Sequence, residues 1–136
     1  MKTKVLLVLL PVVAGSCAQL PAGNAGGPLQ PQGVTGPCQV KPFFLLGLRS
    51  VPAELTIRNT GEACTFTLIN YAFQKYLNAA LVTMPASNGR ATAELVSGNF
   101  QALVTYVPRP GYTGTDRFSV TLEPNATGVT VNVTVQ

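Results

Sequence analysis

The residues of this chain with the greatest capacity for chemistry are three cysteines and five acidic side chains, and no histidine accompanies them. Without histidine, neither a Ser-His-Asp triad nor a Cys-His pair can form. Paired carboxylates for glycoside hydrolysis require two acids to converge. Glu94 and Glu123 both fall on strand faces that the sequence predicts to be solvated. These observations predict a protein that is not an enzyme and that needs no cofactor.

The chain is also poorly supplied with metal ligands. Two cysteines cannot complete a tetrahedral zinc site without further donors. Calcium takes six to eight oxygen ligands, usually including several carboxylates, but Asp116 is the only aspartate and the glutamates are dispersed. We therefore predict no metal site. Asp116 is instead expected to accept backbone N–H bonds within its own loop.

The three cysteines are Cys17, Cys38 and Cys64, an odd number that leaves one thiol without a partner in an oxidising compartment. We predict that Cys38 and Cys64 form a disulfide, because Cys17 lies in an N-terminal segment with the pattern of an export signal. Closing a loop of about 25 residues would stabilise the fold by roughly 3 kcal/mol.

Residues 1–16 have the pattern of a secretion signal, and we predict that they form one. Lys2 and Lys4 precede an apolar run from Val5 to Val13, which is too short to span a bilayer. The following Ala14-Gly15-Ser16-Cys17 resembles the lipobox of bacterial lipoproteins, in which the cysteine becomes the acylated first residue. Alanine stands here where leucine is usual, three positions before the cysteine.

Two outcomes of processing stay open. Acylation of Cys17 would give a lipid-anchored protein, and Ala18 after the cysteine resembles the pattern of lipoproteins sent to the outer membrane. Such a protein would face the periplasm or the cell surface. Cleavage after Ala18, with Ser16-Cys17-Ala18 as the small-residue site, would give a soluble periplasmic or secreted protein.

Removal of the signal takes away two of nine basic residues, so the formal charge falls from 9 − 5 = +4 to 7 − 5 = +2. The remaining basic residues are scattered singly, whereas nucleic-acid binding needs a basic cluster. We predict no nucleic-acid partner. Residues 17–37 are rich in proline and glycine and are predicted to form a flexible tether.

Residues 38–136 are predicted to form one β domain. Their apolar residues alternate with polar ones, as in the Val129 to Val135 segment, and turn sequences such as Pro110-Gly111 separate the segments at regular intervals. This pattern is typical of antiparallel strands with one buried face. The Tyr71 to Val82 segment fits either a helical turn or an extended chain with a loop, and we favour the extended form.

The segment from Tyr106 to Val120, YVPRPGYTGTDRFSV, resembles the Y-x-P-x-x-G-[FY]-x-G-x-D-x-F pattern of bacterial cadherin-like and immunoglobulin-like repeats of surface proteins. Pro85 and Gly89 resemble the hairpin that precedes it in those repeats. The resemblance implies an immunoglobulin-like Greek-key β-sandwich of about seven strands. Those repeats usually occur in tandem, whereas this chain carries one copy.

Two features suggest contacts with partners. Phe43, Phe44, Leu45 and Leu46 form an apolar patch soon after Cys38, which fits either a buried edge strand or a docking strand. Arg109 lies in a predicted exposed loop. The leading hypothesis is a non-enzymatic envelope lipoprotein, anchored in the membrane, that serves as a structural or accessory subunit with other envelope proteins and leaves oligomer formation open. The alternative is a periplasmic binding module, either an enzyme inhibitor or a glycan binder.

Overall fold

Nine β-strands and no helix make up the regular structure of the described residues. The computed structural model describes residues 29–45, 49–69, 76–96, 101–124 and 126–136. The strands are β1 Gln32–Thr35, β2 Cys38–Val40, β3 Ser50–Ile57, β4 Cys64–Ile69, β5 Ala79–Met84, β6 Gly89–Leu95, β7 Gln101–Pro108, β8 Gly114–Glu123 and β9 Thr127–Val135.

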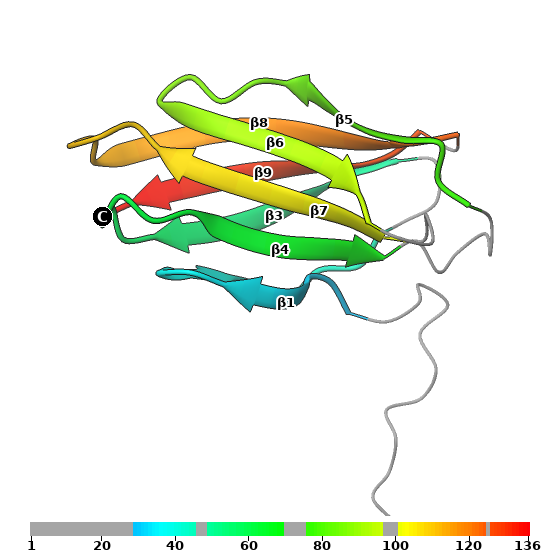
Figure 1. Cartoon of the computed structure of the whole chain (residues 1–136), viewed down its shortest axis with the longest axis horizontal. Helices are drawn as coiled ribbons and strands as arrows, with labels where there is room; N and C mark the ends of the chain where they lie inside the picture. The colour runs from blue at the N-terminus through cyan, green and yellow to red at the C-terminus, as the bar shows by residue number, and fades with distance from the viewer. Residues whose placement is uncertain (1–28, 46–48, 70–75, 97–100, 125) are drawn as a thin grey trace, which may run out of the picture.

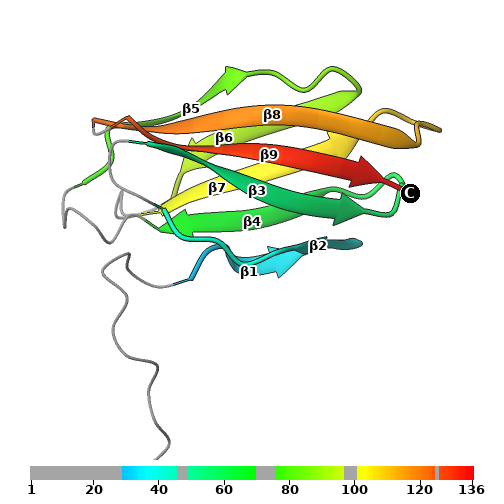
Figure 2. The ribbon, with the colours of Figure 1, turned by 180° about the vertical axis from the view of Figure 1, so that it is seen from behind.

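The strands assemble into two stacked sheets (Figures 1 and 2). One sheet has four strands in the order β1-β4-β7-β6, and the other has five in the order β2-β3-β9-β8-β5. The predicted all-β, two-layer architecture is therefore confirmed. Viewed as in Figure 1, β4, β6 and β7 lie in front of β8 and β9.

The sequence alternation becomes an alternation of burial. Cys64, Phe66 and Leu68 of β4 are buried while the residues between them are partly exposed, and β9 follows the same rule. The two inner faces meet in one hydrophobic cluster. At its centre the Tyr106 ring of β7 stacks on the Phe118 ring of β8, with 5.6 Å between ring centroids and 6° between planes. Aromatic rings packed across two sheets bury a large apolar area.

One strand pairing departs from the expected antiparallel arrangement. β3 pairs with β9 in parallel over eight residue pairs, from Ser50 with Gly128 to Ile57 with Val135, whereas every other pairing of the described strands is antiparallel. A period of two places side chains on alternating faces whichever way the neighbouring strand runs. The alternation therefore could not predict this parallel pairing.

The expected number of strands, about seven, was too low, and the domain begins earlier than predicted. β2 lies at one edge of the five-stranded sheet with β3 beside it, and both precede the Tyr106 to Val120 segment that carries the sequence resemblance. The predicted tether 17–37 is wrong at its C-terminal end, because β1 pairs with β4 and Gln30 is buried. Pro31 and Pro37 flank β1 and gave this segment the composition of a linker.

The predicted signal, residues 1–16, and Cys17 lie outside the described residues. So do residues 71–75 of the Tyr71 to Val82 segment, for which two conformations were considered. The part of that segment within β5 is extended, as favoured. Within the described ranges, no helix is long and apolar enough to cross a membrane.

Candidate functional site

The most elaborate polar arrangement of the domain surrounds Asp116 at the start of β8. Its Oδ1 accepts hydrogen bonds from the backbone N–H of Ser87 at 2.9 Å and of Arg117 at 2.8 Å. Its Oδ2 accepts from the Asn88 backbone N–H at 3.0 Å and from the Tyr106 hydroxyl at 2.8 Å. We call Asp116 together with its four donors, on Tyr106, Ser87, Asn88 and Arg117, the Asp116 clasp.

Four donors make the buried carboxylate tolerable. Only 8% of Asp116 is exposed, and burial by itself would raise its pKa. The hydrogen bonds from the Tyr106 hydroxyl and from the backbone of Arg117, Ser87 and Asn88 outweigh that effect and lower the pKa of Asp116 below its usual value. Burial, followed by the bond to Asp116, raises the pKa of Tyr106 well above that of a free tyrosine. The clasp thus contains an ionised aspartate and a neutral tyrosine at neutral pH.

Gly89, at the start of β6, leaves room for the Tyr106 hydroxyl. A Cβ atom at Gly89 would lie 2.7 Å from the Tyr106 hydroxyl and 2.6 Å from the Val107 carbonyl oxygen. Both distances are shorter than real Cβ contacts allow. Glycine at position 89 is therefore required for the tyrosine to reach the aspartate.

Asp116 accepts backbone hydrogen bonds, as predicted, but two of its three backbone donors lie outside the predicted loop. We expected backbone donors from its own loop, and Arg117 is one such donor. The other two backbone donors, Ser87 and Asn88, lie 29 and 28 residues away in the turn between β5 and β6. Contacts of that kind depend on how the two sheets stack, which the local sequence does not specify.

The turn that carries Arg109 is also tied to the rest of the domain. The Asn59 side-chain N–H group donates to the carbonyl oxygens of Arg109, at 2.9 Å, and Tyr112, at 3.0 Å. The Arg109 guanidinium lies 5.6 Å from the Tyr112 ring centre, and the Tyr112 hydroxyl donates to the Thr115 carbonyl at 2.6 Å. Gly111 adopts a positive φ, 73°, in the turn that the Pro110-Gly111 sequence predicts. Arg109 is therefore exposed on a fixed turn.

The predicted disulfide between Cys38 and Cys64 is present, with 5.8 Å between the Cα atoms. Cys38 belongs to β2 of the five-stranded sheet and Cys64 to β4 of the four-stranded sheet. Cys64 is fully buried and Cys38 is partly buried. The bond joins the two layers on the side where β1 and β2 lie (Figure 2).

The apolar segment after Cys38 is mostly part of the core. Phe43 and Leu45 are buried, Phe44 is partly exposed and Leu46 lies outside the described residues. Their burial makes Phe43 and Leu45 packing residues in this structure, so of the described residues in this segment only Phe44 offers an exposed surface. The prediction that the segment binds a partner stays a prediction.

Gln30 is a structural residue that no sequence pattern predicted. Its backbone exchanges two hydrogen bonds with Phe43, at 2.7 and 2.8 Å. Its side chain bonds both the carbonyl and the N–H of Ile69, at 3.0 and 3.2 Å. The Gln30 side chain therefore bonds the last residue of β4, Ile69, and continues the contact between the β1 segment and β4 beyond the paired backbone. A glutamine between prolines carried no signal that it would be buried.

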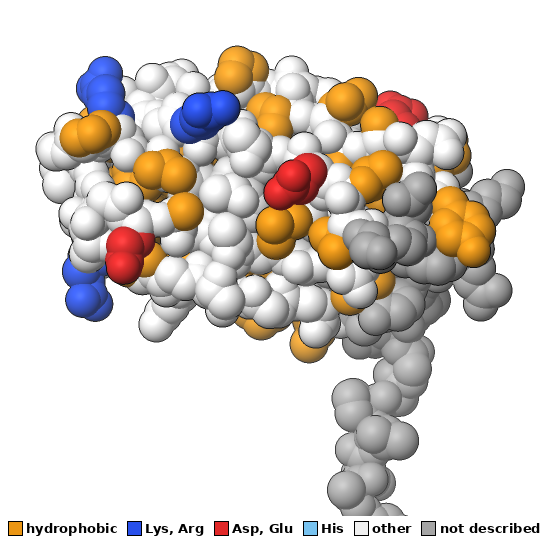
Figure 3. All heavy atoms as spheres, in the orientation of Figure 1, with side chains coloured by type: hydrophobic (Ala, Val, Ile, Leu, Met, Phe, Trp, Pro, Cys, Tyr) orange, Lys and Arg blue, Asp and Glu red, His pale blue; other side chains and the backbone are white. Residues whose placement is uncertain are grey.

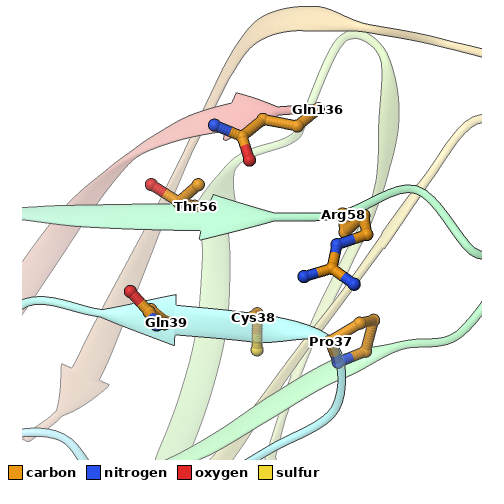
Figure 4. A pocket seen from close by; sticks show the side chains of 6 residues that line it. All are labelled: Pro37, Cys38, Gln39, Thr56, Arg58 and Gln136. Carbon is orange, nitrogen blue, oxygen red and sulfur yellow. The ribbon is translucent and has the colours of Figure 1, made fainter.

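Two shallow hollows lie on the surface. The first has a volume of about 390 Å³ and is shown in Figure 4. In Figure 4 the Arg58 side chain reaches toward β2, while the sulfur of Cys38 is directed away from the guanidinium. The residues that line this first hollow are Pro37, Cys38, Gln39, Thr56, Arg58 and Gln136.

The second hollow, of about 470 Å³, lies over the outer face of the five-stranded sheet and reaches the Asp116 clasp. Glu54, Asn132 and Arg117 form a row across β3, β9 and β8, because Asn132 is paired with each of the other two. The Asn132 side-chain N–H group donates to Glu54 at 3.3 Å. This row offers donors and acceptors but no aromatic ring for a ligand to stack on.

The outer face of the four-stranded sheet shows no concentrated patch. In Figure 3 its hydrophobic side chains lie in separate spots among polar atoms, with few charged groups. Within the ranges that the structure describes, no three of the residues that bind metals gather closely enough to hold an ion. No family model matches the chain, and a search of the curated proteins found no match either.

Proposed function

We propose that the chain is a non-enzymatic cell-envelope lipoprotein whose β-sandwich serves as a structural or accessory subunit of an outer-membrane or surface assembly. The observation that carries this proposal is a disulfide-linked sandwich with open strand edges on both sides. Open edges present unpaired backbone groups that can pair with another chain. A covalently stapled sandwich suits a folded subunit in an oxidising compartment.

We further propose that the sandwich is immunoglobulin-like. In that fold, strands A, B, E and D form one sheet and C, F and G the other. If β4 to β9 are assigned as B to G, the observed orders β4-β7-β6 and β5-β8-β9 match B-E-D and C-F-G, and β1 takes the place of A. The disulfide departs from the antibody pattern, because it joins β2 to β4 rather than B to F.

The Asp116 clasp supports a role other than catalysis. All four of its hydrogen bonds come from donors that the fold holds in place, and three of these are backbone groups. Its acceptor atoms face the turn between β5 and β6 and the core tyrosine. A carboxylate whose ionised form is stabilised in this way is poorly suited to transfer protons near neutral pH.

The proposed membrane anchor is tested by mass spectrometry of the mature protein. We expect an N-terminal Cys17 carrying acyl chains, and a Cys17→Ser variant that leaves the membrane fraction. A mature protein that begins at Gln19 without lipid would contradict the anchor. It would leave a soluble periplasmic module as the better assignment.

The proposed assembly role is tested separately, by crosslinking in intact cells followed by purification from solubilised membranes. We expect other envelope proteins to copurify in amounts comparable to the chain. Recovery of the chain alone, with crosslinking shown to be efficient on a known envelope complex, would contradict the assembly role.

A second candidate function is supported by the polar hollow that contains Glu54, Asn132 and Arg117. A row of carboxylate, amide and guanidinium groups can bond neighbouring sugar hydroxyls, so a glycan-binding module is the alternative. Binding of envelope oligosaccharides that is lost in Asn132→Ala, but retained in Thr92→Ala on the other sheet, would favour it.

A further inference from the structure

Four of the described strands lie at sheet edges: β1 and β6 in one sheet, β2 and β5 in the other. Proteins protect such edges with short strands, prolines, charged side chains or irregular backbone. Three of these edges carry that protection. β1 has four residues between two prolines and an irregular register, β2 has three residues, and β6 carries Arg90 and Glu94.

The fourth edge, β5, has the least protection. It contains six residues, AALVTM, with no charge, no proline and no glycine. Its register with β8 becomes irregular only after Val82, so residues 79–82 form a regular edge. Leu81, at the middle of β5, is 48% exposed, which is high for a leucine in a strand.

The hydrogen bonds of the sheet show which backbone groups of β5 have no partner among the described strands. The Gly128 N–H group, in β9, donates to the Arg49 carbonyl at 3.3 Å, and the Gln136 N–H group, just after β9, donates to the Ile57 carbonyl at 2.9 Å. The backbone N–H and C=O groups of even-numbered residues of β9 therefore point toward β3. Because backbone groups alternate along a strand, odd-numbered residues of β9 point toward β8. Val131 of β9 is paired with Phe118 of β8. The backbone groups of even-numbered residues of β8 therefore point toward β9, and those of odd-numbered residues point toward β5.

The same alternation continues into β5. Leu81 is paired with Thr121, an odd-numbered residue of β8, so the backbone groups of Leu81 point toward β8. The N–H and C=O groups of Ala80 and Val82 therefore point to the open edge. Their side chains pack against the core, while Leu81 extends its side chain from the outer face of the sheet.

We propose that two copies of the chain pair antiparallel through their β5 edges, with Leu81 on the two-fold axis. In this arrangement the N–H and C=O groups of Ala80 exchange hydrogen bonds with those of Val82 in the other copy. The two Leu81 residues form the closely spaced, non-hydrogen-bonded pair, in which Cα atoms lie about 4.5 Å apart. The two five-stranded sheets then become continuous.

A second copy is the occupant that fits this edge best. Two-fold pairing requires a strand that is complementary to itself, and a segment without charge meets its own copy without repulsion. The Leu81 side chains, exposed in the single chain, cover each other. This inference deepens the proposed function and rests on it, since a self-pairing edge serves an assembly subunit by repeating the chain.

The primary test is crosslinking of a Leu81→Cys variant of the full chain, exported and processed by the cell. A Cα separation of about 4.5 Å lies within the range that a disulfide can bridge. We expect mild oxidation to give a covalent dimer in at least about tenfold higher yield than in a Val34→Cys variant, because only the paired edge holds the two introduced thiols together. Val34 is the matched control because it is 37% exposed on another edge strand, β1. The unsubstituted chain, which retains Cys17, sets the baseline.

A second measurement does not depend on an introduced cysteine. In analytical ultracentrifugation the wild-type chain should show a concentration-dependent dimer, because pairing of one edge buries less area than a permanent dimer requires. Leu81→Lys should abolish the dimer, since it places two positive charges opposite each other, while Thr92→Lys on β6 should leave it intact. Thermal unfolding of both variants establishes that they fold.

Equal crosslinking of the Leu81→Cys and Val34→Cys variants would overturn the β5 pairing. So would a wild-type chain that stays monomeric up to about 1 mM. These results are independent of the proposed assembly role. If other envelope proteins still copurify with Leu81→Lys, the assembly role stands without self-pairing. If the dimer forms and nothing else copurifies, self-pairing stands alone.

Discussion

Asp116 is a carboxylate within an apolar sandwich, and its donors explain why the fold accepts it. Each of its two oxygens accepts two hydrogen bonds, and these bonds offset most of the free-energy cost of removing the carboxylate from water. In return, the carboxylate fixes the turn between β5 and β6 against the core tyrosine. Removing it would leave Ser87, Asn88 and Tyr106 with unsatisfied donors.

The first prediction concerns acid stability. The pKa of Asp116 is lower in the folded chain than its ordinary value, so its contribution is present above the unfolded pKa of about 3.9 and is lost as pH falls through the folded pKa. Asp116→Asn should lose about 2–3 kcal/mol at neutral pH and should show a weaker fall in unfolding free energy between about pH 5 and 2. Urea denaturation at a series of pH values measures both.

The control for the acid prediction is Glu94→Gln, which removes an exposed acid from β6. It should retain the pH dependence of the wild-type chain. If Asp116→Asn showed the same pH dependence as the wild type, the assignment of the acid-sensitive contribution to the clasp would be wrong.

The second prediction concerns Gly89. Gly89→Ala should cost roughly 1–3 kcal/mol, because the added methyl group forces the Tyr106 ring or the β7 backbone to move. Tyr106→Phe removes one of the contacting atoms, the hydroxyl oxygen, so the two substitutions should be non-additive in a double-mutant cycle. Thr92→Ala, on the exposed face of β6, should change stability by less than about 0.5 kcal/mol. Strict additivity of Gly89→Ala and Tyr106→Phe would contradict the proposed contact.

The first two strands and the disulfide connect the two sheets. β1 and β2 are consecutive in sequence but belong to different sheets, and the disulfide joins β2 to β4 just after this change of sheet. Gln30 holds the start of the same segment by bonding to Ile69 and Phe43. The N-terminal part of the domain is therefore attached to both layers.

The third prediction concerns this covalent link. The disulfide closes a loop with a sequence separation of 26 residues, and its loss should lower the unfolding free energy by about 3 kcal/mol. A variant with both Cys38→Ala and Cys64→Ala avoids burying a polar group at the fully buried Cys64 position. Guanidinium denaturation of this variant and of the reduced wild-type chain should give similar midpoints. A reduced wild type as stable as the oxidised protein would contradict the prediction.

At the scale of the whole molecule, β9 is the central strand of the five-stranded sheet. It pairs in parallel with β3 and antiparallel with β8, so it connects the start of the domain to its end. Strand pairs that are distant in sequence cannot form one at a time from local contacts. We therefore expect the two sheets to unfold together.

The fourth prediction tests that cooperativity. Val131→Ala, at a fully buried position in the middle of β9, should cost about 2–3 kcal/mol, while Thr134→Ala on the exposed face should cost less than about 0.5 kcal/mol. Near-ultraviolet circular dichroism of the tyrosines reports on tertiary packing, to which the buried Tyr106 contributes, and far-ultraviolet circular dichroism reports on the strands. The two transitions should coincide, and separate midpoints would indicate sheets that unfold independently.

Sequence patterns alone were enough to predict the all-β class, the disulfide and the alternating strands. Alternation with a period of two places side chains on opposite faces, and once Cys17 was set aside as part of the predicted processing site, the two remaining cysteines left one pairing. The Pro110-Gly111 turn followed from the φ angles that these residues favour. These features depend on local geometry or on simple counting.

No local pattern predicted the parallel pairing of β3 with β9, the start of the domain before β1 or the partners of Asp116, and all three became apparent in the folded arrangement. Each joins residues that are far apart in sequence: Asp116 lies 29 residues from Ser87 and Gln30 lies 39 from Ile69. Alternation specifies which face a side chain occupies but does not specify the neighbour or its direction. These features arise because two layers must satisfy buried polar groups at the positions where they meet.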